Sequence, residues 1–149
     1  MQPRIHTEGD GRVLDVLGNR LLEKAGSEDL GGGAAVFVQT VMPRNGPPAH
    51  FHRHTDEFFY VLEGEVDAWI GDRHVKLGPG MSATLPRGIV HRFDNLSDKP
   101  TKVLTVVTPG EGARFFEDID RERPSLPRDL AKLVEIVGRH DIEVVEPTA

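Results

Sequence analysis

The sequence of 149 residues contains no cysteine. This absence excludes a disulfide framework, a zinc ribbon, a thiolate nucleophile and a cysteine-ligated iron–sulfur cluster. A chain of this length is expected to form one domain whose core is large enough to fold without a disulfide or a structural metal. Any bound metal is therefore expected to serve the function, and its soft ligands must come from the seven histidines and three methionines.

Long apolar runs and runs of basic residues are also missing. No apolar segment approaches the roughly 18 residues of a membrane-spanning helix, and the first 20 residues lack the continuous apolar core of a signal peptide. Lys and Arg are not clustered and the formal net charge is -6, so the sequence offers no basic patch to nucleic acid or to an anionic membrane. We expect a cytoplasmic protein with neither partner.

Short segments rich in Val, Phe, Ile, Leu and Thr alternate with turns through the middle of the chain. Many of the 16 glycines and 11 prolines lie between these segments. Strands of this length, at a spacing of about 8 to 12 residues, predict an all-β sandwich or barrel. The expected strands are residues 19–25, 34–42, 57–63, 65–70, 73–77, 81–85, 89–94 and 101–108.

The periodicity changes from that of strands to that of helices after residue 112. We therefore divide the chain into a β-barrel over residues 1–112, with its core at about 21–108, and a helical tail over 113–149 that packs on the barrel. The usual role of an apolar stripe places this tail against the outside of the sheet, and a lid over the barrel mouth is the alternative. The apolar residues that predict two helices are Phe115, Phe116, Ile119, Leu130, Leu133, Val134 and Val137.

His50 and His52 begin the first of two histidine motifs. In an extended segment, side chains two positions apart point to the same side, so these two imidazoles converge on one point. A turn through residues 53–56 can return Glu57 to the same place on the next strand, where its carboxylate adds an anionic oxygen ligand. Taken alone, this group fits a polar loop equally well.

The second motif reads Gly80-x5-Pro86-x-Gly88-x2-His91-x3-Asn95 and places a third histidine on a strand after a Pro/Gly turn. A chance match to five specified residues at fixed spacing occurs about once in a million start positions. Three neutral imidazoles and one carboxylate suit Fe(II), Mn, Co, Ni, Cu or Zn, and leave positions free for water, substrate or dioxygen. The histidines that we set aside as surface or core residues are His6, His74 and His140.

With both motifs in place, the sequence resembles the cupin superfamily. The signatures of that family are Gly-x5-His-x-His-x3 or 4-Glu-x6-Gly and Gly-x5-Pro-x-Gly-x2-His-x3-Asn. The second signature is matched in full, and the first is matched except at its leading glycine, where this chain has Arg44 and the nearest glycine is Gly46. We expect this departure to change only the shape of the turn. The resemblance covers residues 21–108 strongly and the tail loosely.

The resemblance implies a small jelly-roll barrel, a double-stranded β-helix, with a divalent transition metal inside it. The implied metal ligands are His50, His52, Glu57 and His91. A frame made of His52, His54 and Glu57 is the alternative, although its spacing departs from the family pattern. Outside that frame, His54 is expected beside the ligands or at the mouth of the site.

Small cupins that resemble quercetin 2,3-dioxygenase share the run Pro-Pro-Ala-His-Phe-His of this chain. The implied reaction is the addition of dioxygen to a small oxygen-chelating substrate, such as a flavonol-like phenol or an enediol. Glu57 is expected to act both as ligand and as the base that takes the substrate hydroxyl proton. Strand parity places Phe59, Val61 and Phe93 in the substrate pocket, with His54 nearby.

Two other functions remain open for a chain with these motifs. One is a metal-dependent isomerase, epimerase or decarboxylase that acts on a sugar or keto acid without dioxygen. The other is a non-catalytic cupin that binds a small ligand, because the fold alone does not decide function. Jelly-roll cupins often pair through the edges of their sheets, so we expect a homodimer.

Overall fold

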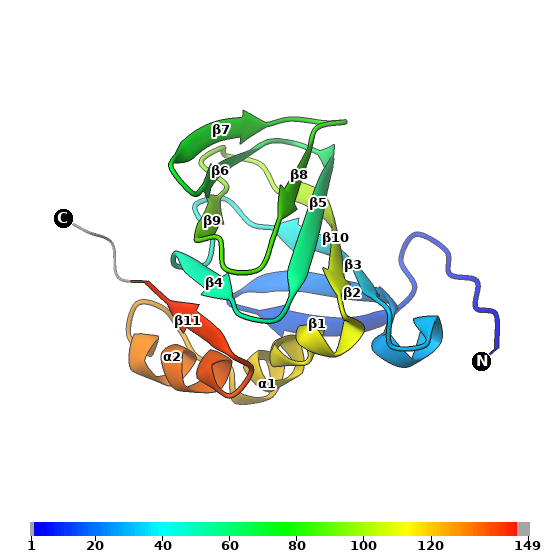
Figure 1. The fold of residues 1–149 in the computed structure, drawn as a ribbon. Helices are drawn as coiled ribbons and strands as arrows, with labels where there is room; N and C mark the ends of the chain where they lie inside the picture. Colours follow the sequence, from blue (N-terminus) through cyan, green and yellow to red (C-terminus); the bar gives the residue numbers. More distant parts are fainter. Residues whose placement is uncertain (1, 146–149) are drawn as a thin grey trace.

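Two antiparallel sheets form the barrel in the computed structural model, which describes residues 2–145 (Figure 1). The larger sheet contains, in spatial order, β1 (Arg12–Val16), β2 (Asn19–Ala25), β3 (Ala35–Val41), β10 (Thr101–Thr108), β5 (Asp56–Glu63) and β8 (Ser82–Leu85). The smaller sheet contains β11 (Ile142–Val144), β4 (His50–His52), β9 (His91–Asp94), β6 (Val66–Ile70) and β7 (Arg73–Leu77). The helices are α1 (Phe115–Glu122), α2 (Leu130–Gly138) and two short 3-10 turns, Ser27–Leu30 and Gly110–Ala113.

This architecture confirms the predicted all-β jelly roll with C-terminal helices. Every strand expected from the sequence is present within two residues of its predicted bounds. The expected strands do not include β1, β4 or β11. β1 and β11 lie at the edges of their sheets, and the sequence predicts β4 only as an extended segment. Neither α1 nor α2, the α-helices of the described residues, is long and apolar enough to cross a membrane.

Buried and partly exposed residues alternate strictly along β3, which shows that one face of the larger sheet points to the interior of the barrel. Ala35, Phe37, Gln39 and Val41 are buried, and the residues between them are only partly covered. Val41 belongs to an apolar core between the two sheets, whereas Phe37 belongs to a second core that includes the tail. The inward face is therefore covered by the smaller sheet at one end and by the tail at the other.

The tail covers the interior side of the larger sheet, which corrects the expectation that it packs against the outside. Figure 1 shows α1, α2 and β11 together at the end of the barrel that lies away from β7. Aromatic packing contributes, because the rings of Phe37 on β3 and Phe116 on α1 meet edge to face at 5.2 Å between centroids. The tail residues of this second core are Ala113, Phe115, Phe116, Ile119, Leu133, Ile136, Val137 and Ile142.

The buried face of α2 is rotated about the helix axis relative to the predicted one. Leu133 and Val137 are buried as expected, but Leu130 and Val134 are exposed and Ile136 is buried in their place. The buried set still follows the i, i+3, i+4 spacing of an amphipathic helix. The sequence pattern places Leu130 and Val134 in the stripe, and contact with the barrel instead buries the face that carries Ile136.

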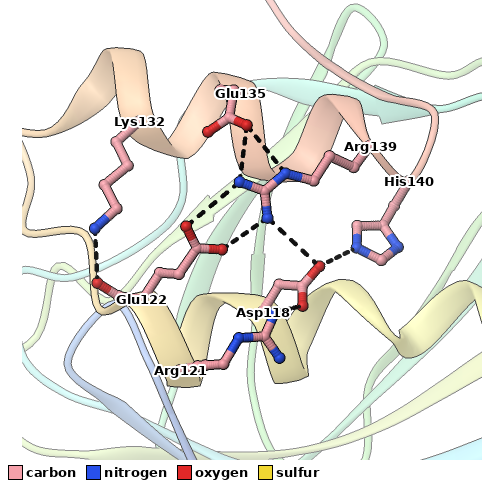
Figure 2. Close-up of polar contacts among 7 residues, drawn as sticks. All are labelled: Asp118, Arg121, Glu122, Lys132, Glu135, Arg139 and His140. Carbon is pink, nitrogen blue, oxygen red and sulfur yellow. Dashed lines mark hydrogen bonds and ion pairs between the residues drawn. The ribbon is translucent and has the colours of Figure 1, made fainter.

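An ion-pair network joins α1 to α2 on their solvent side. Figure 2 shows Arg139 between Glu122 and Glu135, at 2.7 Å and 2.8 Å from their carboxylate oxygens. His140 lies 2.7 Å from the Asp118 carboxylate through its Nε2 atom. The Arg139 guanidinium lowers the pKa of the Glu122 carboxyl. Single exposed pairs contribute little, but a connected set fixes the two helices relative to each other.

The turn residues of the two motifs have structural roles near the site. Asn95 is fully buried, and its side-chain amide donates to the Val41 carbonyl oxygen at 3.0 Å. Arg44 stands where the family signature has glycine, and it adopts a left-handed backbone with φ of 58°. At Gly46 a β-carbon would lie 1.8 Å from the Phe93 carbonyl oxygen, so the close approach that requires glycine occurs two residues later.

Candidate metal centre

Three imidazoles meet inside the barrel on two neighbouring strands of the smaller sheet. β4 carries His50 and His52, and His50 is directly opposite His91 in the antiparallel pairing of β4 with β9. The ring centroids are 4.5 Å apart for His50 and His91, and 5.2 Å apart for His50 and His52. One nitrogen from each ring lies within 4.8 Å of the others. This spacing allows all three to contact one ion.

Backbone carbonyl groups orient two of these rings. The Nδ1 atom of His50 lies 2.8 Å from the Pro48 carbonyl oxygen, and that of His91 lies 3.1 Å from the Ile89 carbonyl oxygen. Since a carbonyl oxygen only accepts hydrogen bonds, we assign the proton to Nδ1 in both rings, which leaves each Nε2 lone pair free. Metal-binding histidines are commonly held in this way by a partner on the other nitrogen.

The centre of the cluster contains buried polar atoms that have no hydrogen-bond partner within residues 2–145. They include both ring nitrogens of His52 and the Nε2 atom of His91. Both side chains are nearly completely buried, so no bulk water compensates these atoms. Native proteins contain few such groups, and each one calls for an explanation. A bound cation would accept the lone pair of the His91 Nε2 atom and the single lone pair of the neutral His52 ring.

Glu57 faces the imidazoles from β5 of the opposite sheet. Its Oε1 atom is 3.4 Å from the His52 Nε2 atom, and its Oε2 atom is 3.8 Å from the His91 Nε2 atom. The side chain is buried and is lined up with the inward residues of its strand. The carboxylate therefore completes a set of three nitrogens and one oxygen, a donor set suited to a divalent transition metal.

Burial shapes the protonation of all four groups. It lowers the pKa of His50 to about 4 and that of His52 to about 3, and the neighbouring imidazoles add to both effects. Burial also lowers the pKa of His91. All three rings are consequently neutral at pH 7, the form that binds metal. Burial raises the pKa of Glu57 to about 7, so in the absence of a cation this carboxyl readily takes up a proton.

A cavity of about 70 Å³ adjoins the centre between the barrel and the tail. His50, Glu57 and His91 form part of its wall, and no Lys or Arg of the described residues lines it. The other polar residues of the wall are Asn19, Gln39 and Thr105. The tail supplies much of the apolar wall through Phe115, Phe116, Ile119, Leu133, Val137, Ile142 and Val144.

The structure brings some of the predicted pocket residues to the cavity but not others. Phe59 and Phe93 lie in its wall and meet edge to face at 5.3 Å between ring centroids. Val61 is instead buried in the core between the sheets, because that part of β5 is covered by the smaller sheet. His54 is exposed in the loop after β4, and its Nε2 atom faces the Asp141 carboxylate at 3.7 Å. The frame of His52, His54 and Glu57 is therefore not assembled.

The histidines set aside in the sequence lie away from the centre, and two of them have acidic partners. His74 Nε2 is 2.7 Å from the Asp67 carboxylate, and its ring stacks on Trp69 of β6 at 4.5 Å. His140 belongs to the network between the tail helices. The cavity residues that sequence reasoning missed include Gln39 and Thr105. Their signal is a polar residue at an inward position of a strand whose other inward residues are mostly apolar.

The family model described as Cupin domain matches residues 37–107, the segment that carries both histidine motifs. With the observed fold, this match identifies residues 37–107 as a cupin domain. Cupin domains share a scaffold that hosts many activities, so the family by itself does not define a reaction.

Known proteins similar to this chain include enzymes. The quercetin 2,3-dioxygenase of Bacillus subtilis (strain 168) is 27% identical over 97% of this chain and 45% of that enzyme. The polyketide synthase CurC of Streptomyces cyaneus is 25% identical over 66% of each protein. The solved structure of KdgF from Halomonas sp. superposes with a TM-score of 0.64 at 16% identity, and the match covers 72% of this chain and 94% of KdgF. The chain thus spans about half of the dioxygenase.

Proposed function

We propose that His50, His52, Glu57 and His91 hold one divalent transition metal and that the chain is a dioxygenase. Its substrate would be a small oxygen-chelating molecule of flavonol or enediol type. The observation that carries this proposal is the group of buried imidazole nitrogens without partners, opposite a buried carboxylate. When bound, the metal supplies a Lewis acid and, for Fe, Mn, Co, Ni or Cu, a path for electrons between substrate and dioxygen.

Glu57 has the properties of a general base at this position. It is the one carboxylate among the described residues of the cavity wall, and its burial keeps competing water away from it. Its carboxylate lies in the cavity wall, where it can accept the proton of a substrate hydroxyl. Loss of that proton makes the substrate oxygen anionic and a stronger ligand. The aromatic and aliphatic wall keeps water away from this step.

The lining of the cavity favours a neutral, largely apolar substrate. Sugar acids, sugar phosphates and keto acids carry anionic groups, and sites for them usually contain Lys or Arg. Among the described residues of the wall there is neither. This composition weighs against the isomerase, epimerase and decarboxylase alternatives, and it suits a phenolic ring.

A second candidate is proton transfer on a phenolic, polyketide-like substrate without dioxygen. The similarity to the polyketide synthase CurC motivates it, and the apolar cavity with one buried carboxyl group would serve such a reaction equally well. Both candidates use the same four side chains and differ only in the consumption of dioxygen.

Oxygen-electrode assays of the metal-loaded protein separate the two candidates. Protein loaded separately with Fe(II), Mn(II), Co(II), Ni(II) and Cu(II) is mixed with quercetin or catechol. The dioxygenase proposal predicts uptake of dioxygen that depends on the protein, the metal and the substrate, and that falls to the background rate in Glu57→Gln. Fully loaded protein that consumes no dioxygen with any of these substrates would contradict it.

The size of the cavity leads to a prediction about substrate entry. A volume of about 70 Å³ is far below the roughly 300 to 1,000 Å³ of pockets for drug-sized ligands. A molecule as large as quercetin therefore enters only when part of the wall moves. β11 is the strand most suited to move, because it pairs with β4 over only three residues at the edge of its sheet.

A disulfide between β4 and β11 tests this prediction in a chain that has no other cysteine. Phe51 and Glu143 are directly opposite, and such pairs have Cα atoms roughly 5.5 Å apart, within the range that a disulfide spans. Oxidised Phe51→Cys/Glu143→Cys protein, already loaded with metal, is expected to bind quercetin at least about 10-fold more weakly than the wild type. Calorimetric titration measures this affinity.

Two controls accompany the disulfide variant. Reduction with a phosphine should restore quercetin binding, and catechol, a single ring, should bind equally well before and after reduction. Unchanged quercetin binding in the fully oxidised protein would show that the substrate enters without movement of β11.

A further inference from the structure

Thr105 is a buried hydroxyl in the cavity wall that makes no hydrogen bond among the described residues. It lies on β10, directly opposite Phe37 on β3 and Phe59 on β5. Its side chain is 2% exposed, its Oγ1 atom has no partner, and it lines the cavity next to the metal centre. Leaving a buried hydroxyl without a partner costs about 1 to 3 kcal/mol. The Thr105 hydroxyl is therefore a polar group in the cavity wall that a bound molecule could satisfy.

A second threonine on the same face of β10 shows what a purely structural hydroxyl does here. The Oγ1 atom of Thr101 donates to the Glu65 carbonyl oxygen at 2.7 Å and accepts from the Glu65 amide at 3.2 Å. Thr101 is also completely buried, but it lies outside the cavity wall. The contrast separates a threonine that stabilises the fold from one that faces an open space.

The register places Thr105 in a diagonal row of polar side chains. Because Thr105 is opposite Phe37 and Phe59, it is diagonal to Gln39 on β3 and to Glu57 on β5. Diagonal neighbours across a pair of strands are roughly 7 to 8 Å apart. The row crosses the inward face between the two apolar cores. It begins at the proposed base and ends at a buried amide that also lines the cavity.

We propose that Thr105, together with Gln39, binds a further oxygen of the substrate, in addition to those directed at the metal centre. A hydroxyl and an amide can each donate and accept, so the group they recognise is an uncharged hydroxyl or carbonyl. The part of the substrate that occupies the cavity is thus a single neutral aromatic ring. Its oxygens are directed both to the metal centre and to Thr105. This assignment rests on the proposed function, in which substrate oxygens contact the metal, and it adds a second contact at Thr105 and Gln39.

Comparison of two small phenols with three forms of the protein tests the assignment. Catechol carries two adjacent hydroxyl groups, and pyrogallol carries one more on the same ring. Each is titrated without oxygen into cobalt-loaded wild type, Thr105→Val and Thr105→Ser, and the affinity is measured by calorimetry. Wild type and Thr105→Ser should bind pyrogallol about 5- to 10-fold more tightly than catechol, and Thr105→Val should bind the two equally.

Two further readouts separate this role from a structural one and from failure of the metal site. Thr105→Val should bind as much cobalt as the wild type and should melt at the same or a higher temperature, because it removes an unpaired buried hydroxyl. If Thr105→Val keeps the preference for pyrogallol, or the wild type lacks it, the subsite is wrong while the metal site stands. A wild type that binds neither cobalt nor any of Fe, Mn, Ni, Cu and Zn would instead refute the proposed function.

Discussion

Replacing His50 with alanine is expected to lower the affinity for a divalent metal more than about 100-fold, since even residues that only orient metal ligands contribute 10- to 100-fold. The side chain supplies one of three converging nitrogens, and its Nδ1 contact with Pro48 directs the other nitrogen to the centre. Because the side chain is half-buried at the cavity wall, its removal should leave the fold intact. Dialysis against a metal-buffered solution, followed by elemental analysis, measures the affinity.

His54→Ala is the matched control for this experiment. It removes an imidazole from the same motif, two residues beyond His52, but one that is exposed and directed at Asp141. We expect unchanged metal affinity in this variant. Equal losses in His50→Ala and His54→Ala, or a loss in His54→Ala alone, would mean that the proposed ligand set is wrong.

Glu57→Gln is expected to affect stability and metal binding in opposite directions. Burial raises the folded-state pKa from 4.5 to about 7, so the unfolded chain releases this proton more easily than the folded one. The metal-free wild type therefore loses stability as the pH rises from about 4.5 to 7, by about 3 kcal/mol in total for this group. A glutamine cannot ionise and avoids that loss.

Urea unfolding with a chelator present, at pH 5 and at pH 8, measures this effect. The free energy of unfolding of Glu57→Gln should exceed that of the wild type by about 3 kcal/mol at pH 8 and by much less at pH 5. The same variant should bind metal more weakly, because it lacks the anionic ligand. A variant that is less stable than the wild type by the same amount at both pH values would contradict this account of Glu57.

Local patterns in the sequence carried the prediction of strands, helices and histidine ligands. Alternation on a segment such as residues 34–42 reports directly on a half-buried strand, and His50 and His52 share a side because they lie on one strand. β11 could not be predicted in this way. It has only three residues, and its partner β4 lies about ninety residues earlier in the chain. Pairing over such a separation depends on the whole fold.

The placement of the tail illustrates a second limit. Periodicity predicts an apolar stripe on each helix, but it does not give the surface that buries this stripe, and on α2 it wrongly includes Leu130 and Val134. Packing against the interior face, beside Phe37, makes Phe115 and Val137 part of the cavity wall. The same limit applies to Thr105. Strand parity gives its direction, but only the three-dimensional structure shows that its hydroxyl lacks a partner.

The proposed function depends on one functional metal ion held by three histidines and Glu57. Elemental analysis of the purified wild type tests it most directly, after separate loading with Fe, Mn, Co, Ni, Cu and Zn and removal of free ion. We expect about one metal ion per chain for at least one of these metals, which is the stoichiometry of a single four-ligand centre. Protein that remains metal-free with all six would contradict it.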